Sequence, residues 1–186
     1  RLLRALESKA LRDRAILVVS SDHGEAFGEH GTTEHTKTLY EELLRVPLVV
    51  WGRGVVPRTI DTPVTLVDLG PTFLDLYGQP TPSWFVGESL VPLLAGRDVE
   101  LRRPIVAEGR LRRAMYVGDL KVSVDLRRKT IEAYDLSRDP GELVELSSRE
   151  PERVGPALAA LRRFFEVHAY AEGGYWLLLW NLLVGL

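Results

Sequence analysis

The hydrophobic positions of this chain follow a helical period first and then form two unbroken runs. Residues 1–13 have apolar residues at helical spacing, and the first run, Ile16–Val19, follows them. Four aliphatic residues between polar neighbours are typical of a strand buried on both faces of a mostly parallel sheet. The second run, Val46–Trp51, has Pro47 near its start, where a strand tolerates proline. The pattern predicts an α/β arrangement for this part of the chain.

One helical turn is predicted before the second run and two helices after it. A helical turn is expected over residues 39–44, and a longer helix begins at Val67 or Asp68 and ends at Gly78. After a proline-rich loop, residues 88–95 form another short helix or turn. Asp68 and Asp75 are expected to serve as helix-capping and surface residues.

The last third of the chain changes to short runs rich in β-branched and aromatic residues. Their order and spacing predict an antiparallel meander over residues 104–108, 114–117, 121–125 and 130–135. Helical spacing returns over residues 151–167. We therefore predict three regions: 1–103 as part of an α/β core, 104–168 as a small sheet with a helix, and 169–186 as an apolar tail.

Both ends of the chain invite an interpretation. The chain starts at Arg1 without a signal segment, and we interpret this start as a cut into a longer protein. The apolar stretch Tyr175–Leu186 is shorter than the roughly 20 residues of a membrane-spanning helix. It fits the first half of such a helix, an interfacial anchor, or a packed or frayed tail. Membrane association through either end is therefore one expectation.

Composition excludes several classes of function. With 24 basic and 26 acidic residues, the chain offers no electrostatic argument for nucleic acid. The absence of cysteine excludes disulfides and thiolate metal sites.

Candidate chemistry begins directly after the first apolar run, at Asp22 and His23. Open α/β sheets bind ligands at the carboxyl ends of their strands, and a carboxylate beside an imidazole can coordinate a divalent cation. The polar, glycine-rich stretch that follows, residues 22–38, has the length of a functional loop and contains His35 and Lys37. Glu29 and His30 are expected to serve the structure of this loop.

A longer string of residues around Asp22 and His23 resembles the sulfatase family of the alkaline-phosphatase-like superfamily. The resemblance extends over about residues 15–165 in the order of the family. It rests on these stretches: Ser21–Glu25, Gly28–Gly31, His35, Leu39–Glu42, Arg45–Leu48, Leu66–Asp75, Gly87–Leu90, Leu93–Gly96 and Tyr134–Glu142.

This resemblance implies a fold and a role for each matching residue. The fold is α/β: part of a doubly wound, mostly parallel sheet with helices, then a small C-terminal antiparallel sheet and a final helix. Asp22 and His23 match metal ligands, and one divalent ion is expected, calcium first, with manganese or zinc as alternatives because imidazole suits them. His35 and Lys37 match substrate-binding positions, and His35 could act as general acid for the leaving group.

The implied function is hydrolysis of sulfate esters of small molecules or glycans. The family's nucleophile and first metal ligands lie in an N-terminal half that the match does not reach, so the chain by itself is expected to be inactive. Alternatives of the same superfamily are a phosphodiesterase, a phosphonate monoester hydrolase or a phosphoethanolamine transferase. A non-catalytic remnant of the fold is a third interpretation. A bacterial periplasmic, extracellular or membrane-attached location is expected before a cytoplasmic one.

Overall fold

The chain forms two units, each built from two separate stretches of sequence. The structure is a computed structural model that describes all residues except 1, 9–10, 12–13, 34, 36–37 and 169–186. The first unit contains Arg1–Asp22 and Val46–Arg103, and the second contains His23–Arg45 and Pro104–Leu186. The predicted tail, residues 169–186, lies outside the described residues. Among the described residues, no helix has the length and apolar character needed to cross a membrane.

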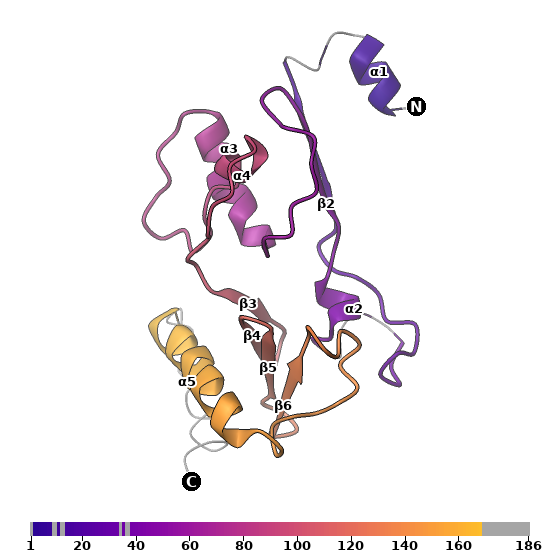
Figure 1. Cartoon of the computed structure of the whole chain (residues 1–186), viewed down its shortest axis with the longest axis vertical. Coiled ribbons are helices and arrows are strands. Elements are labelled where there is room, and N and C mark those ends of the chain that lie inside the picture. The colour runs from indigo at the N-terminus through magenta and orange to yellow at the C-terminus, as the bar shows by residue number, and fades with distance from the viewer. Residues whose placement is uncertain (1, 9–10, 12–13, 34, 36–37, 169–186) are drawn as a thin grey trace. The chain divides into compact units, whose positions relative to one another are not determined.

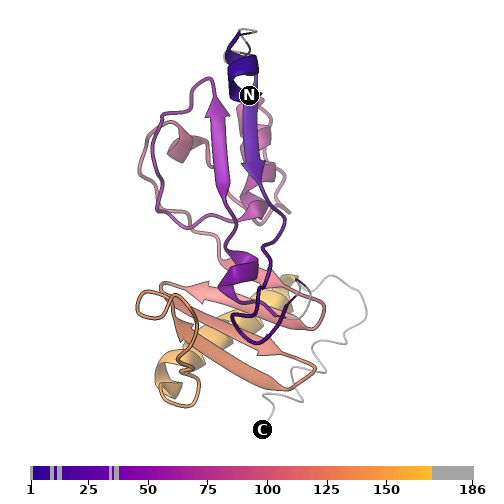
Figure 2. The ribbon, with the colours of Figure 1, turned by 90° about the vertical axis from the view of Figure 1, so that its right-hand side faces the viewer.

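The first unit is built on a pair of strands. Helix α1 (Leu2–Ser8) precedes β1 (Ile16–Ser20), which pairs with β2 (Leu48–Gly52) in the register Val18↔Val50. Figure 2 shows the two strands as adjacent arrows of opposite direction.

The pairing of β1 and β2 corrects the prediction that these strands are buried on both faces of a mostly parallel sheet. In the described residues the pair is antiparallel, and Val19 and Val49 are 48% and 56% exposed. On β2, Leu48 and Val50 pack against the core, whereas Val49 between them points to the other face. An apolar run predicts a strand, but its composition does not specify the direction of the partner strand.

Short helices complete the first unit. A 3₁₀ turn, η1 (Leu66–Asp68), leads into α3 (Leu69–Leu76), and α4 (Val91–Leu94) follows the proline-rich loop. The buried side chains of Leu90, Leu93 and Leu94 pack against Leu48, Val50 and neighbouring apolar residues. The helix predicted to begin at Val67 or Asp68 and to end at Gly78 is therefore present, and the helix or turn predicted over residues 88–95 is present but shorter than expected.

The second unit contains the predicted meander. Its strands are β3 (Ile105–Glu108), β4 (Arg112–Val117), β5 (Leu120–Asp125) and β6 (Thr130–Asp135), hydrogen-bonded antiparallel in that order. A two-residue turn at Gly118 and Asp119 joins β4 to β5, and Gly118 has a φ of 58°, which glycine adopts without strain. The small antiparallel sheet and the final helix confirm the predicted α/β class.

Helix α5 (Pro151–His168) covers one face of this sheet (Figure 1). Val154, Ala157, Leu161 and Phe165 recur at spacings of three and four and pack against Leu120, Val122 and Val124 of β5. At the end of β6, Asp135 accepts hydrogen bonds from Ser137 and from Arg153 of α5, which lower the pKa of Asp135 to about 2. Apolar packing and this ion pair together attach the helix to the sheet.

Candidate functional site

The two predicted metal ligands follow β1 and are consecutive in sequence. Asp22 lies two residues beyond the end of the strand, as predicted, and is the last residue of the first unit. His23 is the first residue of the second unit, and both side chains are exposed.

The donor chemistry of Asp22 and His23 suits a divalent cation, since a carboxylate oxygen and an imidazole nitrogen are ordinary metal ligands. Two ligands are fewer than the four or more that a protein metal site uses. The described part of the chain contains no group of three or more His, Asp or Glu side chains arranged to hold a metal ion. The assignment of Asp22 and His23 as metal ligands therefore stays a prediction.

His23 opens a small hairpin that we call the histidine hairpin, residues 23–35 without the undescribed residue 34. An antiparallel bridge joins Phe27 to Thr33, and the N–H of Gly31 donates to the carbonyl of Gly28 in the turn. Extending this register by two residues on each side places Glu25 opposite His35. Their side chains meet there, with Nδ1 of His35 3.2 Å from Oε2 of Glu25.

The hairpin brings two of the predicted site residues together. The rings of His23 and His35 are stacked, with centroids 4.5 Å apart and an interplanar angle of 15°. Nδ1 of His23 lies 2.7 Å from the carbonyl oxygen of Gly24. Lys37, the other predicted substrate-binding residue, lies outside the described residues.

These contacts assign the tautomers of both rings. A carbonyl and a carboxylate only accept hydrogen bonds, so Nδ1 of each histidine carries a proton. In the neutral form Nε2 then holds the lone pair, the arrangement that carboxylate- and carbonyl-bound histidines use to ligate a metal or take up a proton.

The turn of the hairpin is fixed by a third histidine. His30 is 12% exposed; its Nδ1 lies 2.8 Å from Oε1 of Glu42 in α2 (Glu41–Leu44), and its Nε2 lies 3.3 Å from the carbonyl oxygen of Glu142. Its ring stacks on Tyr40 at a centroid distance of 3.7 Å. The expectation that His30 serves the structure of the loop agrees with these contacts.

A buried charge network lies next to these contacts in the same unit. Lys121 of β5 is 1% exposed, and its Nζ lies 3.0 Å from Oε1 of Glu41 and 2.8 Å from Oε1 of Glu142. Oε1 of Glu142 accepts no aligned hydrogen bond within the described residues, so its contact with Lys121 is an ion pair. The other oxygen of Glu142 accepts a hydrogen bond from the N–H of Glu41 at 2.6 Å.

Burial and negative charge set the ionisation of the groups around this network. Burial raises the pKa of the Glu142 carboxyl above its usual value, although Lys121 opposes the shift. Burial and the carboxylate of Glu41 raise the pKa of Tyr116, whose hydroxyl donates to Glu41 at 2.5 Å. Burial and the carboxylate of Glu132 raise the pKa of Tyr40 to about 12, so its hydroxyl stays protonated and donates to Glu132.

The roles of Glu41, Lys121 and Glu142 were not predicted from the sequence. Glu41 and Glu142 lie within stretches that carry the family resemblance. The resemblance marks these positions but does not say what the two side chains do. Lys121 alternates with Leu120 and Val122 along β5, and so lies on the sheet face opposite to α5.

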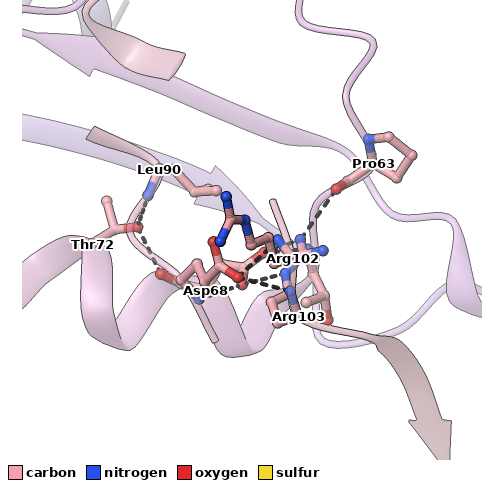
Figure 3. A network of polar contacts seen from close by, with 8 residues as sticks. Pro63, Asp68, Thr72, Leu90, Arg102 and Arg103 are labelled. Carbon is pink, nitrogen blue, oxygen red and sulfur yellow. Dashed lines mark hydrogen bonds and ion pairs between the residues drawn. The ribbon is translucent and has the colours of Figure 1, made fainter. Parts of the chain in front are cut away.

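A second buried ion pair organises the first unit and corrects the expectation that Asp68 is a surface residue. Asp68 is 0% exposed; it caps the turn by accepting the N–H of Thr65 at 2.9 Å, and it also pairs with Arg103. Nε of Arg103 lies 2.8 Å from Oδ1, and Nη2 lies 2.5 Å from Oδ2 (Figure 3). The N–H of Glu88 donates to the same carboxylate at 3.0 Å. The capping role is therefore confirmed, whereas the exposed position is wrong.

Comparisons with known proteins find sulfatases. Residues 1–79 match the family model described as Sulfatase. An arylsulfatase K from Xenopus laevis is 28% identical over 215 residues, covering 99% of this chain and 38% of that protein. An extracellular sulfatase SULF-1 homolog from Drosophila melanogaster is 30% identical over 138 residues, covering 70% of this chain and 12% of that protein.

Solved structures agree with the sequence matches. A structure described as a 2-O GAG sulfatase has a TM-score of 0.80 at 25% identity, covering 94% of this chain and 40% of that one. A phosphonate monoester hydrolase from Agrobacterium radiobacter has a TM-score of 0.72 at 21% identity, covering 91% of this chain and 38% of that one. At this identity the match shows only that the two proteins share a fold.

The fold is that of the alkaline-phosphatase-like superfamily of hydrolases. Within this superfamily the predicted resemblance to the sulfatase family is confirmed, by the sequence match over residues 1–79 and by the sulfatase relatives and structures. The chain spans about two-fifths or less of the length of these relatives.

Proposed function

We propose that this chain supplies part of the active site of a metal-dependent sulfatase that hydrolyses sulfate esters of small molecules or glycans. The observation that carries the proposal is the histidine hairpin, which stacks His23 on His35 in a sulfatase-like fold. The 2-O GAG sulfatase described by one similar structure supports a glycan substrate class. The SULF-1 relative, described as extracellular, supports a location outside the cytoplasm.

Each residue of the proposed site has a role that its chemistry permits. Asp22 and Nε2 of His23 would hold the divalent ion, which when bound polarises the ester and stabilises negative charge. Nδ1 of His35, held by Glu25, orients the ring so that Nε2 can hold the proton that the leaving alkoxide needs. Lys37 would bind an oxygen of the sulfate group as a cation.

Phosphorus chemistry is the second candidate, favoured by the fold shared with the phosphonate monoester hydrolase. Sulfate and phosphate groups have the same tetrahedral arrangement of oxygens, and imidazole ligands also suit zinc and manganese. The relative turnover of an aryl sulfate and a bis-aryl phosphate separates the two candidates.

The test uses the enzyme that contains this chain, with the variants Asp22→Ala and His35→Gln. Mutating a residue that only hydrogen-bonds to a metal ligand lowers the affinity for the metal about 10–100-fold. We therefore expect Asp22→Ala to lose bound metal and more than about 100-fold of kcat/KM. We expect His35→Gln to lower kcat while metal content stays unchanged. His168→Gln, outside the matched stretches, is the control and should retain both.

Two outcomes would contradict the proposal. Metal content in Asp22→Ala equal to that of the unaltered enzyme would remove Asp22 from the metal site. A larger kcat/KM for the bis-aryl phosphate than for the aryl sulfate would favour the phosphorus enzyme. The isolated 186-residue chain is expected to hydrolyse neither substrate.

A further inference from the structure

His30 has hydrogen-bond acceptors at both ring nitrogens. Nδ1 faces the carboxylate of Glu42 at 2.8 Å, and Nε2 faces the carbonyl oxygen of Glu142 at 3.3 Å. A neutral imidazole has one N–H and can donate to only one of them, whereas an imidazolium donates to both. The contacts of this ring therefore select its charged form.

The surroundings of His30 carry net negative charge. Glu29 in the hairpin and Glu42 in α2 approach it, as does Glu142 from the turn after β6, while Tyr40 stacks on the ring with its hydroxyl protonated. The Glu142 carboxylate is itself paired with Lys121. Burial alone lowers the pKa of His30, but the hydrogen bond and charge of Glu42, followed by Glu142, outweigh burial and raise it.

We propose that His30 is a positioning residue: as an imidazolium bridging Glu42 and the Glu142 carbonyl, it fixes the turn of the histidine hairpin. The bridge Phe27↔Thr33 transmits this constraint to the base of the hairpin, where His23 stacks on His35. The importance of that stack for catalysis rests on the proposed function. The bridging role of the His30 imidazolium does not depend on the proposed function.

If His30 fixes the turn as an imidazolium, the order of the histidine hairpin depends on pH. A histidine whose pKa is raised by folding contributes stability in full below its ordinary value, 6.5. That contribution is lost as the pH rises through the higher pKa of the folded state. The hairpin should therefore be ordered at mildly acidic pH and loosen above the pKa of His30.

The test is an NMR titration of the chain, which has only four histidines, so that each imidazole can be assigned. In the unaltered chain His30 should titrate above 6.5. In Glu42→Gln it should titrate at 6.5 or below, since burial then dominates. His168→Gln is the control and should leave the titration of His30 unchanged.

Amide exchange provides the second readout, through the N–H of Gly24, which donates to the carbonyl of Leu43 at the base of the hairpin. His30→Gln should lower its protection about tenfold or more at pH 6, the scale of a lost charge-assisted hydrogen bond. His30→Arg keeps a cation at every pH. It should restore protection and remove its dependence on pH between 6 and 9.

Two results would overturn the proposal: titration of His30 at or below 6.5 in the unaltered chain, or equal loss of protection in the Arg and Gln variants. If His30→Gln does not fold, the Glu42→Gln titration still decides. None of these measurements uses sulfatase turnover. An enzyme without sulfatase activity but with a high pKa at His30 would therefore refute the proposed function and leave the positioning role intact.

Discussion

Replacing Lys121 by Met should lower the free energy of unfolding of the second unit by about 3–5 kcal/mol, the usual cost of removing one partner from a buried ion pair. Lys121 is almost wholly buried between the carboxylates of Glu41 and Glu142. Without its ammonium group, two like charges remain close together in a poorly solvated place. Methionine keeps most of the volume of the side chain, so the loss reports charge rather than a cavity.

The effect of Lys121→Met should depend on pH in a predictable direction. The pKa of Glu142 is already raised by burial above its ordinary 4.5, and removal of the lysine raises it further. A carboxyl group with a raised folded pKa costs stability as the pH rises above its ordinary value of 4.5, and the full cost is reached once the pH exceeds the folded pKa. The variant should be least stable near neutral pH and recover part of its stability as the pH falls toward 4.5.

Hydrogen exchange of the β5 amides measures this unit by itself. The double variant Lys121→Met/Glu142→Gln should be more stable than Lys121→Met, since it carries one buried charge fewer. Arg127→Met, at an exposed position in the turn after β5, is the matched control and should stay within about 0.5 kcal/mol. If Lys121→Met lowers the free energy of unfolding by less than 1 kcal/mol at pH 7, the buried ion pairs contribute little to the stability of this unit.

Asp68→Asn should destabilise the first unit by a similar amount, about 3–5 kcal/mol. Asparagine has the same shape but no charge, and it leaves the guanidinium of Arg103, 5% exposed, without its bidentate partner. One of its two acceptor oxygens is also replaced by an amide nitrogen. The N–H groups of Thr65 and Glu88, which donate to different oxygens of Asp68, therefore cannot both keep their acceptors.

With Trp176 and Trp180 replaced by phenylalanine, tryptophan fluorescence follows this unit during urea unfolding, because the remaining Trp51 lies in β2 and Trp84 in the proline-rich loop. Asp75→Asn is the control: Asp75 lies on α3, which follows the turn that ends at Asp68, but it is exposed, with one hydrogen bond from Ser89. It should cost no more than about 1 kcal/mol. Equal transition midpoints for Asp68→Asn and Asp75→Asn would contradict the structural importance given to the buried ion pair.

Local patterns in the sequence were sufficient to predict most elements. The meander and α5 follow from alternation and helical spacing over stretches such as 120–125 and 151–167, where neighbouring residues determine the outcome. The direction of the β1–β2 pair did not follow from sequence. Either direction satisfies an aliphatic run, and the pairing depends on how the intervening chain returns.

The candidate site divides in the same way. The positions of Asp22 at the end of its strand and of His35 in the loop that follows were predicted, because short motifs carry them. The supporting contacts were not, because they join residues far apart in the chain. Lys121 meets Glu41 across 80 residues, and Asp68 meets Arg103 across 35. A charged residue does not reveal from its neighbours that a distant partner will bury it.

The discontinuous second unit has a consequence for biosynthesis. His30 and its acceptor Glu142 are 112 residues apart, and a ribosome adds about 5–20 residues per second, so roughly 6–22 s separate the synthesis of the two groups. Throughout that interval the nascent hairpin has its turn between Gly28 and Gly31 but not the Glu142 carbonyl, and the ammonium of Lys121 is present only in the last part of it. The residues proposed for metal binding and proton transfer are thus translated before the meander and its following turn, which supply the support of the hairpin.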